Sequence, residues 1–428
     1  MVPQQRMASL QLSELITNHP FCTFSLLFIP LALLFFYVAV DGARWRHQRK
    51  LASYEFSTRI LREFSSVEFR QTAARLAEKI EDAARDAAAV DLQDLLQKST
   101  MDSIFKVGFG VELDTLSGTD EAGVAFSKAF DESNHIIFLR FADIFWKVKR
   151  RFNIGLEARL KSNLKVIDEF VLQLISRKRE QMRGRVEVKT HEDVMSRYVL
   201  ASEKDATMTD RYLRDIILGF LIAGKDTSAN TLTWFFYMLC KNPSVQEKIW
   251  AEINFAMETK AAGFGIEEFV GSLTDEVLEK MQYLHAALTE TLRLFPAVPA
   301  DSKFAVEDDV LPDGCKVKKG DGLTYLSYAM GRMTYLWGED AEDFRPERWL
   351  KNEVFMPESP YKFVSFHAGP RSCLGKVFAY RQMKILAATL LHFFVFKLED
   401  EGKIATYKTM FTLHMENGPS VIPFPRFS

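Results

Sequence analysis

The feature that most restricts how this chain can fold is one long apolar helix. Its pattern begins at Thr209–Asp210, a plausible N-cap, and runs to Lys241, where Asn242–Pro243 ends it. With a rise of 1.5 Å per residue, such a helix is roughly 45–50 Å long and crosses a whole domain. Its apolar side chains surround most of its circumference, so other elements must cover it on nearly every side.

The chain after residue 50 is mostly helical in pattern, without an internal repeat or a low-complexity tract. Short strand patterns come late, at Lys316–Lys319, Val395–Leu398 and Tyr407–Met415. A hydrophobic content of 47% and a charged content of 26% are typical of a globular protein. We therefore predict a mainly α (α+β) fold with a long central helix and small β-sheets.

Charge and cysteine content argue against several classes of protein. A formal net charge of −2 and a pI near 6.5 give no support to nucleic-acid binding. The basic runs Lys147–Arg151 and Arg177–Arg179 are local, and we interpret them as solvated helix faces. The four cysteines form neither a CxxC pair nor a cluster with zinc-ligand spacing. A disulfide framework is not expected in so large a chain, and a reducing compartment is the simpler interpretation.

An uncharged stretch near the N-terminus, Phe21–Val40, is long enough to cross a bilayer as a helix. Only Arg6 precedes it, whereas basic residues gather between positions 44 and 50, which places the rest of the chain in the cytoplasm. A cleaved signal peptide is the rival, but no convincing small-residue cleavage site follows. A third interpretation buries the end of the stretch in the globular domain. We favour residues 1–40 as an N-terminal membrane anchor or apolar segment.

The long helix contains polar residues where a continuous apolar rod is expected. The stretch LIAGKDTSAN places Gly224, Asp226 and Thr227 at its middle. Glycine lowers helix stability, and Asp and Thr tend to bond back to the backbone. One account is a kink with a satisfied polar pair. The other is that Gly224 lets a flat ligand lie against the helix while an acid beside a hydroxyl passes protons.

A second cluster of polar residues follows the long helix. In ETLRLFP, Glu290 and Arg293 are i, i+3 neighbours on one helix face and form a possible ion pair. Downstream, FRPERW supplies Arg348, whose guanidinium would complete a triad around Glu290. An isolated ExxR pair is a weak signal because exposed pairs of this kind are common. We interpret Glu290, Arg293 and Arg348 as structural residues.

The loop FVSFHAGPRSCLG holds a cysteine immediately before a long apolar helix. Phe366, Gly369, Arg371, Cys373 and Gly375 spell FxxGxRxCxG, a pattern that chance produces about once in a few million positions. The glycines permit close backbone approach to a flat object, and the guanidinium suits a carboxylate. A cysteine that opens a helix has its thiolate stabilised by the helix dipole and nearby amides. An inert buried cysteine explains neither the arginine nor the glycines.

This loop resembles the haem-ligand loop of the cytochrome P-450 superfamily, and the earlier segments appear in the order of that family. AGKDTS (Ala223–Ser228) resembles its oxygen-activation motif, ETLR its ExxR motif, and FRPERW its PERF-type segment. WRHQRK (Trp45–Lys50) is similar to the helix that holds a haem propionate. The resemblance covers Asp41 to the C-terminus and implies the cytochrome P-450 fold with heme b, iron protoporphyrin IX, as cofactor.

The resemblance also implies roles for single residues. The Cys373 thiolate would be the axial ligand of the haem iron, and Asp226 and Thr227 would be the catalytic residues that steer protons during the activation of O2. The implied cofactor-binding residues are Trp45, Arg49, Ala223, Gly224, Lys303, Phe366, Gly369, Arg371, Cys373 and Gly375. Trp45, Arg49 and Arg371 are the best candidates for the propionates, and Lys303 is a weaker one.

Three further segments resemble the plant clan that hydroxylates fatty acids, often at the ω carbon: Val40–Ser57, Tyr328–Met333 and Trp337–Leu350. This implies a long-chain fatty-acid substrate, with electrons from a membrane-bound NADPH-cytochrome P-450 reductase. The chain itself has no flavin or dinucleotide fingerprint. The implied location is the endoplasmic reticulum membrane, with a single N-terminal anchor and the catalytic domain facing the cytoplasm.

One segment of the family pattern is missing before the domain that we assign to residues 41–428. In the family, a Pro-rich hinge, the first sheet strands and a loop that roofs the substrate separate the anchor from the WRxxRK helix. Here Val40 directly precedes Asp41–Trp45. The chain therefore resembles a form shortened at the N-terminus of this domain, with an incomplete first sheet. The alternative function is a non-catalytic or unstable haem-binding relic or splice form without the pocket roof.

Overall fold

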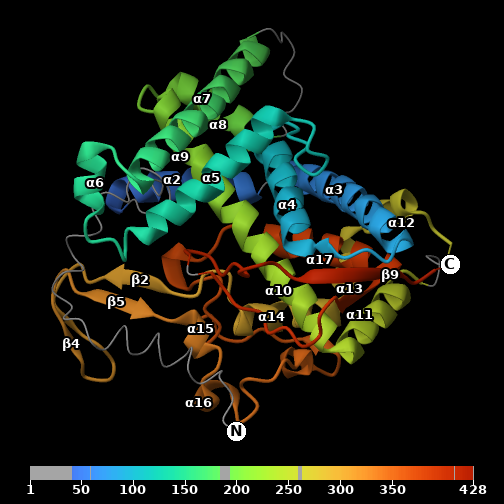
Figure 1. Ribbon diagram of the computed structural model, residues 1–428. Coiled ribbons are helices and arrows are strands. Elements are labelled where there is room, and N and C mark those ends of the chain that lie inside the picture. The colour runs from blue at the N-terminus through green and yellow to red at the C-terminus, as the bar shows by residue number, and fades with distance from the viewer. Residues whose placement is uncertain (1–40, 58, 184–192, 259–262, 409, 428) are drawn as a thin grey trace.

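The computed structural model describes residues 41–57, 59–183, 193–258, 263–408 and 410–427 (Figure 1). The stretch that we interpret as a membrane anchor, residues 21–40, lies outside the described residues. Within the described ranges, no helix combines the length and the apolar character that a membrane span requires.

The described chain is mainly helical with small antiparallel sheets, which confirms the predicted fold class. The longer helices are α2 (Gly42–Ser57), α3 (Arg59–Arg85), α4 (Leu92–Phe109), α5 (Glu121–Leu139), α7 (Leu156–Arg183), α8 (Val194–Lys204), α9 (Asp210–Leu221), α10 (Thr227–Lys241), α11 (Pro243–Ala256), α14 (Gln282–Leu294) and α17 (Lys376–Phe393). Shorter helices are α6 (Trp146–Phe152), α12 (Ile266–Ser272), α13 (Asp275–Lys280), α15 (Ser327–Met330) and α16 (Thr334–Trp337).

Within the described ranges, four small sheets accompany the helices. The largest has the order β1-β9-β8, and the others are the pairs β2-β5, β3-β4 and β6-β7. Their strands are β1 (Val90–Asp91), β2 (Asp301–Phe304), β3 (Asp309–Val310), β4 (Lys316–Val317), β5 (Gly322–Tyr325), β6 (Leu350–Lys351), β7 (Val354–Phe355), β8 (Phe394–Leu398) and β9 (Ser420–Pro425). That a first sheet is incomplete remains a prediction.

The predicted long helix spans α9, a π turn at η3 (Ile222–Asp226) and α10 without a break. The side chain of Thr209 caps its start by accepting a hydrogen bond from the amide of Tyr212 at 3.3 Å. Lys241 is its last residue, and Pro243 opens α11. The predicted extent is therefore confirmed. The π turn, which admits one extra residue, falls on the AGKDTS motif.

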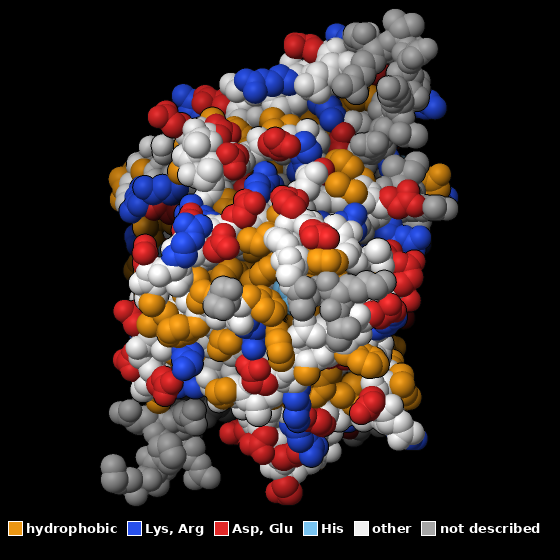
Figure 2. Space-filling view, turned by 90° about the vertical axis from the view of Figure 1, so that its right-hand side faces the viewer, with side chains coloured by type: hydrophobic (Ala, Val, Ile, Leu, Met, Phe, Trp, Pro, Cys, Tyr) orange, Lys and Arg blue, Asp and Glu red, His pale blue; other side chains and the backbone are white. Residues whose placement is uncertain are grey.

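Helices on several sides bury this rod, as its apolar circumference requires. Figure 1 shows α10 crossing the middle of the molecule, and it packs against α4, α11, α14 and α17. Leu221, Leu232 and Phe235 are fully buried. Figure 2 shows apolar side chains gathered in a hollow at the centre of one face, with charged residues around them.

The strand expected at Tyr407–Met415 is wrong. Among the described residues of this stretch, an isolated antiparallel bridge joins Tyr407 to Met415, and the nearest strand is β9, further along the chain. The ends of the stretch pair with each other, because the Lys408 amide donates to the His414 carbonyl at 3.0 Å and the Glu416 amide to the Thr406 carbonyl at 2.8 Å. Leu413, between them, bonds to distant groups. The indole of Trp234 donates to the Leu413 carbonyl at 2.8 Å, and the Leu413 amide donates to the Ala297 carbonyl at 2.9 Å.

Candidate active site

The cysteine loop is closed by its own backbone. The amide of Cys373 donates to the carbonyl of Phe366 at 2.8 Å, so the first residue of the FxxGxRxCxG pattern meets its cysteine. Gly369 has φ of +68°, a left-handed conformation that favours glycine. Gly375 has an ordinary φ of −84°, and a Cβ there would lie 3.9 Å from the Cys373 sulfur, a normal contact. Only the first glycine is therefore required by geometry.

Cys373 precedes the helix and does not open it, because α17 begins at Lys376. Burial raises the pKa of the Cys373 thiol, and the Gly375 amide, Arg49 and Lys376 oppose this only in part. The protein alone therefore does not provide the thiolate stabilisation expected from the sequence. Cys373 nevertheless keeps surface that the rest of the protein does not cover. A bound metal ion deprotonates a coordinating thiol, so this sulfur fits the chemistry of a metal ligand.

Helix α2 brings two of the predicted residues, Trp45 and Arg49, to this loop, which itself holds a third, Arg371. Arg49 donates to the carbonyl of Ser372 at 2.5 Å, one residue before the cysteine. The guanidinium of Arg371 lies 4.4 Å from the centre of the Trp45 ring and forms an ion pair with Asp41. Two guanidinium groups and an indole therefore lie beside the cysteine loop.

Lys303 lies in a series of hydrogen-bonded side chains that does not include Arg49 or Arg371. Its ammonium donates to Asp301 at 2.6 Å, and Asp301 also accepts a hydrogen bond from the Tyr325 hydroxyl at 2.7 Å. That hydroxyl lies 2.7 Å from Nδ1 of His367, within the cysteine loop. Sequence reasoning missed Tyr325 and His367. The only available signal was the position of His367 inside the FxxGxRxCxG pattern.

The π turn directs neighbouring residues to different surroundings. Ala223 is exposed although Leu221 is fully buried and Lys225 is 1% exposed, so the helix has open surface at this point. The hydroxyl of Thr227 donates to the Ala223 carbonyl at 2.6 Å.

A glycine at position 224 is needed for a different reason from the one expected. A Cβ at this position would lie 2.7 Å from Cδ1 of Ile104 on α4. The glycine therefore permits close packing of two helices, and Ala223 supplies the surface that a flat ligand would cover. Ala223 and Cys373 both have exposed surface that a ligand can cover.

Lys225 and Asp226 form a charged cluster that the sequence analysis did not foresee in full. Asp226 is 5% exposed, and its Oδ1 lies 3.2 Å from the ammonium of Lys225. The ammonium also donates a hydrogen bond to Asp131 of α5. A lysine within an apolar helix was the signal available in the sequence.

The structure brings Glu290, Arg293 and Arg348 into one buried network. Arg293 binds the Glu290 carboxylate through two nitrogens, at 2.7 and 2.8 Å, and both side chains are fully buried. Arg348 lies 3.4 Å from the same carboxylate. Trp349 donates to it at 2.8 Å and the amide of Arg345 at 2.9 Å. No member of this network belongs to the cysteine loop.

Comparisons with known proteins agree with this arrangement. A family model described as Cytochrome P450 matches residues 36–422. Cytochrome P450 704C1 of Pinus taeda is 49% identical over 401 residues, which cover 91% of this chain and 77% of the relative. Cytochrome P450 704B1 of Arabidopsis thaliana is 43% identical over 409 residues, with 89% and 78% covered. Cytochrome P450 86B1 of the same plant is 39% identical over 384 residues, with 88% and 68% covered. This chain therefore belongs to the cytochrome P450 family.

Proposed function

We propose that this cytochrome P450 hydroxylates long-chain fatty acids, with O2 and with electrons from NADPH-cytochrome P-450 reductase. Membership of the family makes the chain a haem-binding monooxygenase. The observation that carries the proposal is the cysteine loop. It holds Cys373, a residue with exposed surface, beside Arg49, Arg371 and Trp45.

The residues at this loop fit haem. Cys373 would supply the axial thiolate, and haem with such a ligand supplies the chemistry of O2 activation and substrate oxidation. Arg49 and Arg371 would bind the propionates, because a guanidinium matches a carboxylate in charge and geometry. Arg371 would exchange Asp41 for that partner. Lys303 would first have to leave Asp301, which makes it the weaker candidate.

Asp226 and Thr227 would handle protons in this site. Thr227 donates its own proton to the Ala223 carbonyl, which leaves its oxygen free to accept a hydrogen bond from water. Asp226 is buried on the same turn, where a carboxyl group is well placed to take up and release protons.

An apolar cluster beside the π turn supports an alkyl substrate. Ile222, the first residue of the turn, and Phe411 pack against the buried cluster of Ile136, Ile137 and Leu160, and both remain partly exposed at its edge. Phe411 also contacts two aromatic rings of the α5 region edge-on, at 5.3 and 5.9 Å between ring centres. Apolar surface such as that of Ile222 and Phe411 binds hydrocarbon chains by removing them from water. The fatty-acid assignment rests on this surface and on the three segments that resemble the plant clan.

We place the enzyme at the endoplasmic reticulum membrane, with residues 21–40 as a single anchor and the catalytic domain on the cytoplasmic side. This placement rests on the uncharged stretch and on the basic residues that follow it.

A carbon-monoxide difference spectrum of the reduced protein tests the proposal. The unaltered chain should give the spectrum of thiolate-ligated haem, and Cys373→Ala should abolish it. Cys240→Ser and Cys315→Ser serve as controls that should retain it. With reductase and NADPH, the unaltered chain should convert a long-chain fatty acid into a hydroxy acid. A spectrum that survives in Cys373→Ala would disprove the ligand assignment, and a normal spectrum without product would favour the non-catalytic relic.

A further inference from the structure

A buried lysine lies beside the proposed catalytic acid. The side chain of Lys225 is 1% exposed, and its ammonium contacts the carboxylates of Asp131 on α5 and Asp226 on η3. A buried ammonium is stable only beside groups of opposite charge. The two carboxylates therefore share one cation, which the function proposed above does not use.

The charge on Lys225 is permanent. Burial by itself lowers the pKa of Lys225, but Asp131 and Asp226 more than offset this effect, so the pKa is raised above its ordinary value. Because the ammonium keeps its protons near neutral pH, Lys225 acts through charge and position and does not donate protons. The ring of Phe130 lies 5.9 Å from the same nitrogen and adds a weak cation–π contact.

The two carboxylates that share Lys225 are not equivalent. Asp131 accepts the hydrogen bond from the ammonium. Oδ1 of Asp226 lies 3.2 Å from it but, among the described residues, has no hydrogen-bond donor. Nε2 of His414 is also buried without a partner in the described part of the chain, and burial lowers the pKa of this ring against the opposing charges of Asp226 and Asp131. The neutral His414 therefore leaves Lys225 as the nearby counter-charge for both acids.

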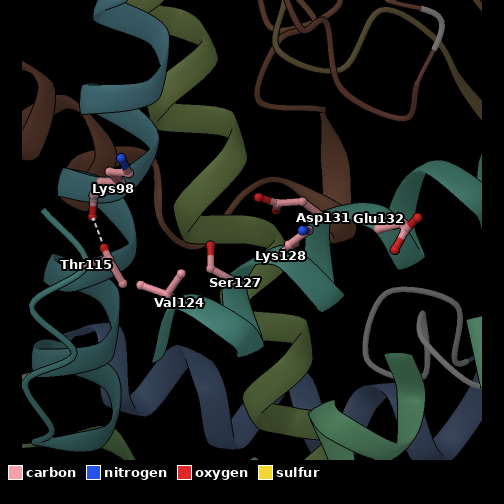
Figure 3. A pocket seen from close by; sticks show the side chains of 7 residues that line it. All are labelled: Lys98, Thr115, Val124, Ser127, Lys128, Asp131 and Glu132. Carbon is pink, nitrogen blue, oxygen red and sulfur yellow. Dashed lines mark hydrogen bonds between the residues drawn. The ribbon is translucent and has the colours of Figure 1, made fainter. Parts of the chain in front are cut away.

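Asp131 connects this cluster to solvent. It lines a pocket of about 490 Å³ between α4 and α5 (Figure 3). The side chain of Asp131 is 48% exposed, whereas Lys225 behind it is 1% exposed. Figure 3 shows the side chains of Asp131 and Glu132 pointing in opposite directions. The other residues of the pocket are Lys98, Thr115, Val124, Ser127 and Lys128.

We propose that Asp131 and Lys225 are positioning residues for Asp226: Asp131 takes the hydrogen bond of the Lys225 ammonium, so that Oδ1 of Asp226 is held at 3.2 Å by charge without a hydrogen bond and can pass protons. The inference rests on the proposed function, in which Asp226 handles protons. Without the Asp131 carboxylate, the ammonium pairs with Asp226 alone. The ammonium then donates its hydrogen bond to Oδ1 of Asp226, the oxygen that would receive the proton, so proton transfer through this side chain slows.

Asp131→Asn tests the proposal, with Glu132→Gln as the matched control. Glu132 is the next residue, carries the same charge and lines the same pocket, but it binds Asn163 and Arg159 instead of Lys225. Full-length, haem-loaded protein is used, and the carbon-monoxide spectrum verifies equal haem loading in each variant.

With reductase, NADPH and a long-chain fatty acid, Asp131→Asn should hydroxylate about tenfold more slowly, a part of the roughly 10²–10⁴ that a positioned proton-transfer group contributes. Its solvent deuterium isotope effect should rise, and Asp131→Glu should restore both values. Glu132→Gln should match the unaltered protein. Equal rates and isotope effects in Asp131→Asn and Glu132→Gln would overturn the proposal.

A stability measurement without turnover tests the shared cation separately. Asp226→Asn is made in the unaltered chain and in Asp131→Asn, and the urea midpoints are compared. If both acids share Lys225, Asp226→Asn lowers the urea midpoint more in the Asp131→Asn protein than in the unaltered chain, because the ammonium then lacks both counter-charges. Additive losses would refute the sharing. If the unaltered chain gives no thiolate-type spectrum or no hydroxy acid, the proposed function fails, while this comparison still decides whether Lys225 is shared.

Discussion

Replacing Glu290 with Gln removes one negative charge from the most buried ionic network of the described chain and changes the side-chain shape little. The carboxylate accepts hydrogen bonds from Arg293, Trp349 and the amide of Arg345. In the variant, one of its oxygens becomes an amide nitrogen that faces these donors and accepts nothing. The Arg293 guanidinium, which is fully buried, then has no carboxylate beside it.

The expected loss of stability follows from that stranded charge. Removing one partner of a buried ion pair lowers the free energy of unfolding by about 3–5 kcal/mol. With an m-value of about 3 kcal/mol/M in urea, the midpoint of unfolding should fall by about 1–1.7 M. Carbonyls of Gly331 and Ala341 also accept from Arg293, and they hold it in place but do not neutralise it.

Urea unfolding followed by circular dichroism measures this loss, and Glu347→Gln is the control. Glu347 lies two residues from Arg345, and its side chain is 44% exposed where it pairs with Lys248. An exposed pair contributes about 0–1 kcal/mol, so the midpoint of this control should move by less than about 0.4 M. Equal midpoints for the two variants would refute the stranded-charge argument. A stable, haem-loaded Glu290→Gln protein with altered turnover would point to a catalytic role instead.

Three other variants give separate tests. Thr227→Ala should retain haem but form more peroxide per NADPH consumed, and unchanged coupling of an active protein would rule out its role in proton delivery. Gly331→Ala would place a Cβ 2.0 Å from the carbonyl oxygen of Arg293, so it should lower the free energy of unfolding in urea by about 1–3 kcal/mol or more. Gly271→Ala is the control, because a Cβ there meets open space, and it should not lower the stability. Burial lowers the pKa of His285 to about 3, so the unfolded chain binds more protons than the folded chain between about pH 6.5 and 3, and the free energy of unfolding falls as the pH is lowered through this range. His285→Phe should make this acid-induced loss of stability smaller. An unchanged dependence of stability on pH would contradict this.

The elements that the sequence predicted well are those with local signals. The central helix has its cap at Thr209 and its stop at Pro243 within its own sequence, and the structure confirms both ends. The strand expected at Tyr407–Met415 failed because alternation alone does not provide a strand neighbour. The backbone of Leu413 instead bonds to Trp234, 179 residues away in the chain.

The candidate site shows the same limit. Spacing identified Cys373, Arg371 and the Glu290–Arg293 pair, because each motif is short. The partners of these motifs are distant in sequence and could not be read from it: Arg49 meets Ser372 across 323 residues, and Lys225 meets Asp131 across 94. Such contacts depend on how whole helices pack.

The π turn explains why one short motif serves several partners. In a regular α-helix, residues 223 to 226 would follow each other at about 100° around a single axis. The wider turn gives Ala223 open surface, sets Gly224 against Ile104 of α4, and buries Lys225 beside Asp131 of α5. Contact with α4 leaves no room for a Cβ at Gly224, so α4 fixes the turn from one side while the ion pair fixes it from the other. The acid at Asp226 is therefore held by two helices that lie outside the cysteine loop, and substitutions on α4 or α5 will alter its position without touching the loop.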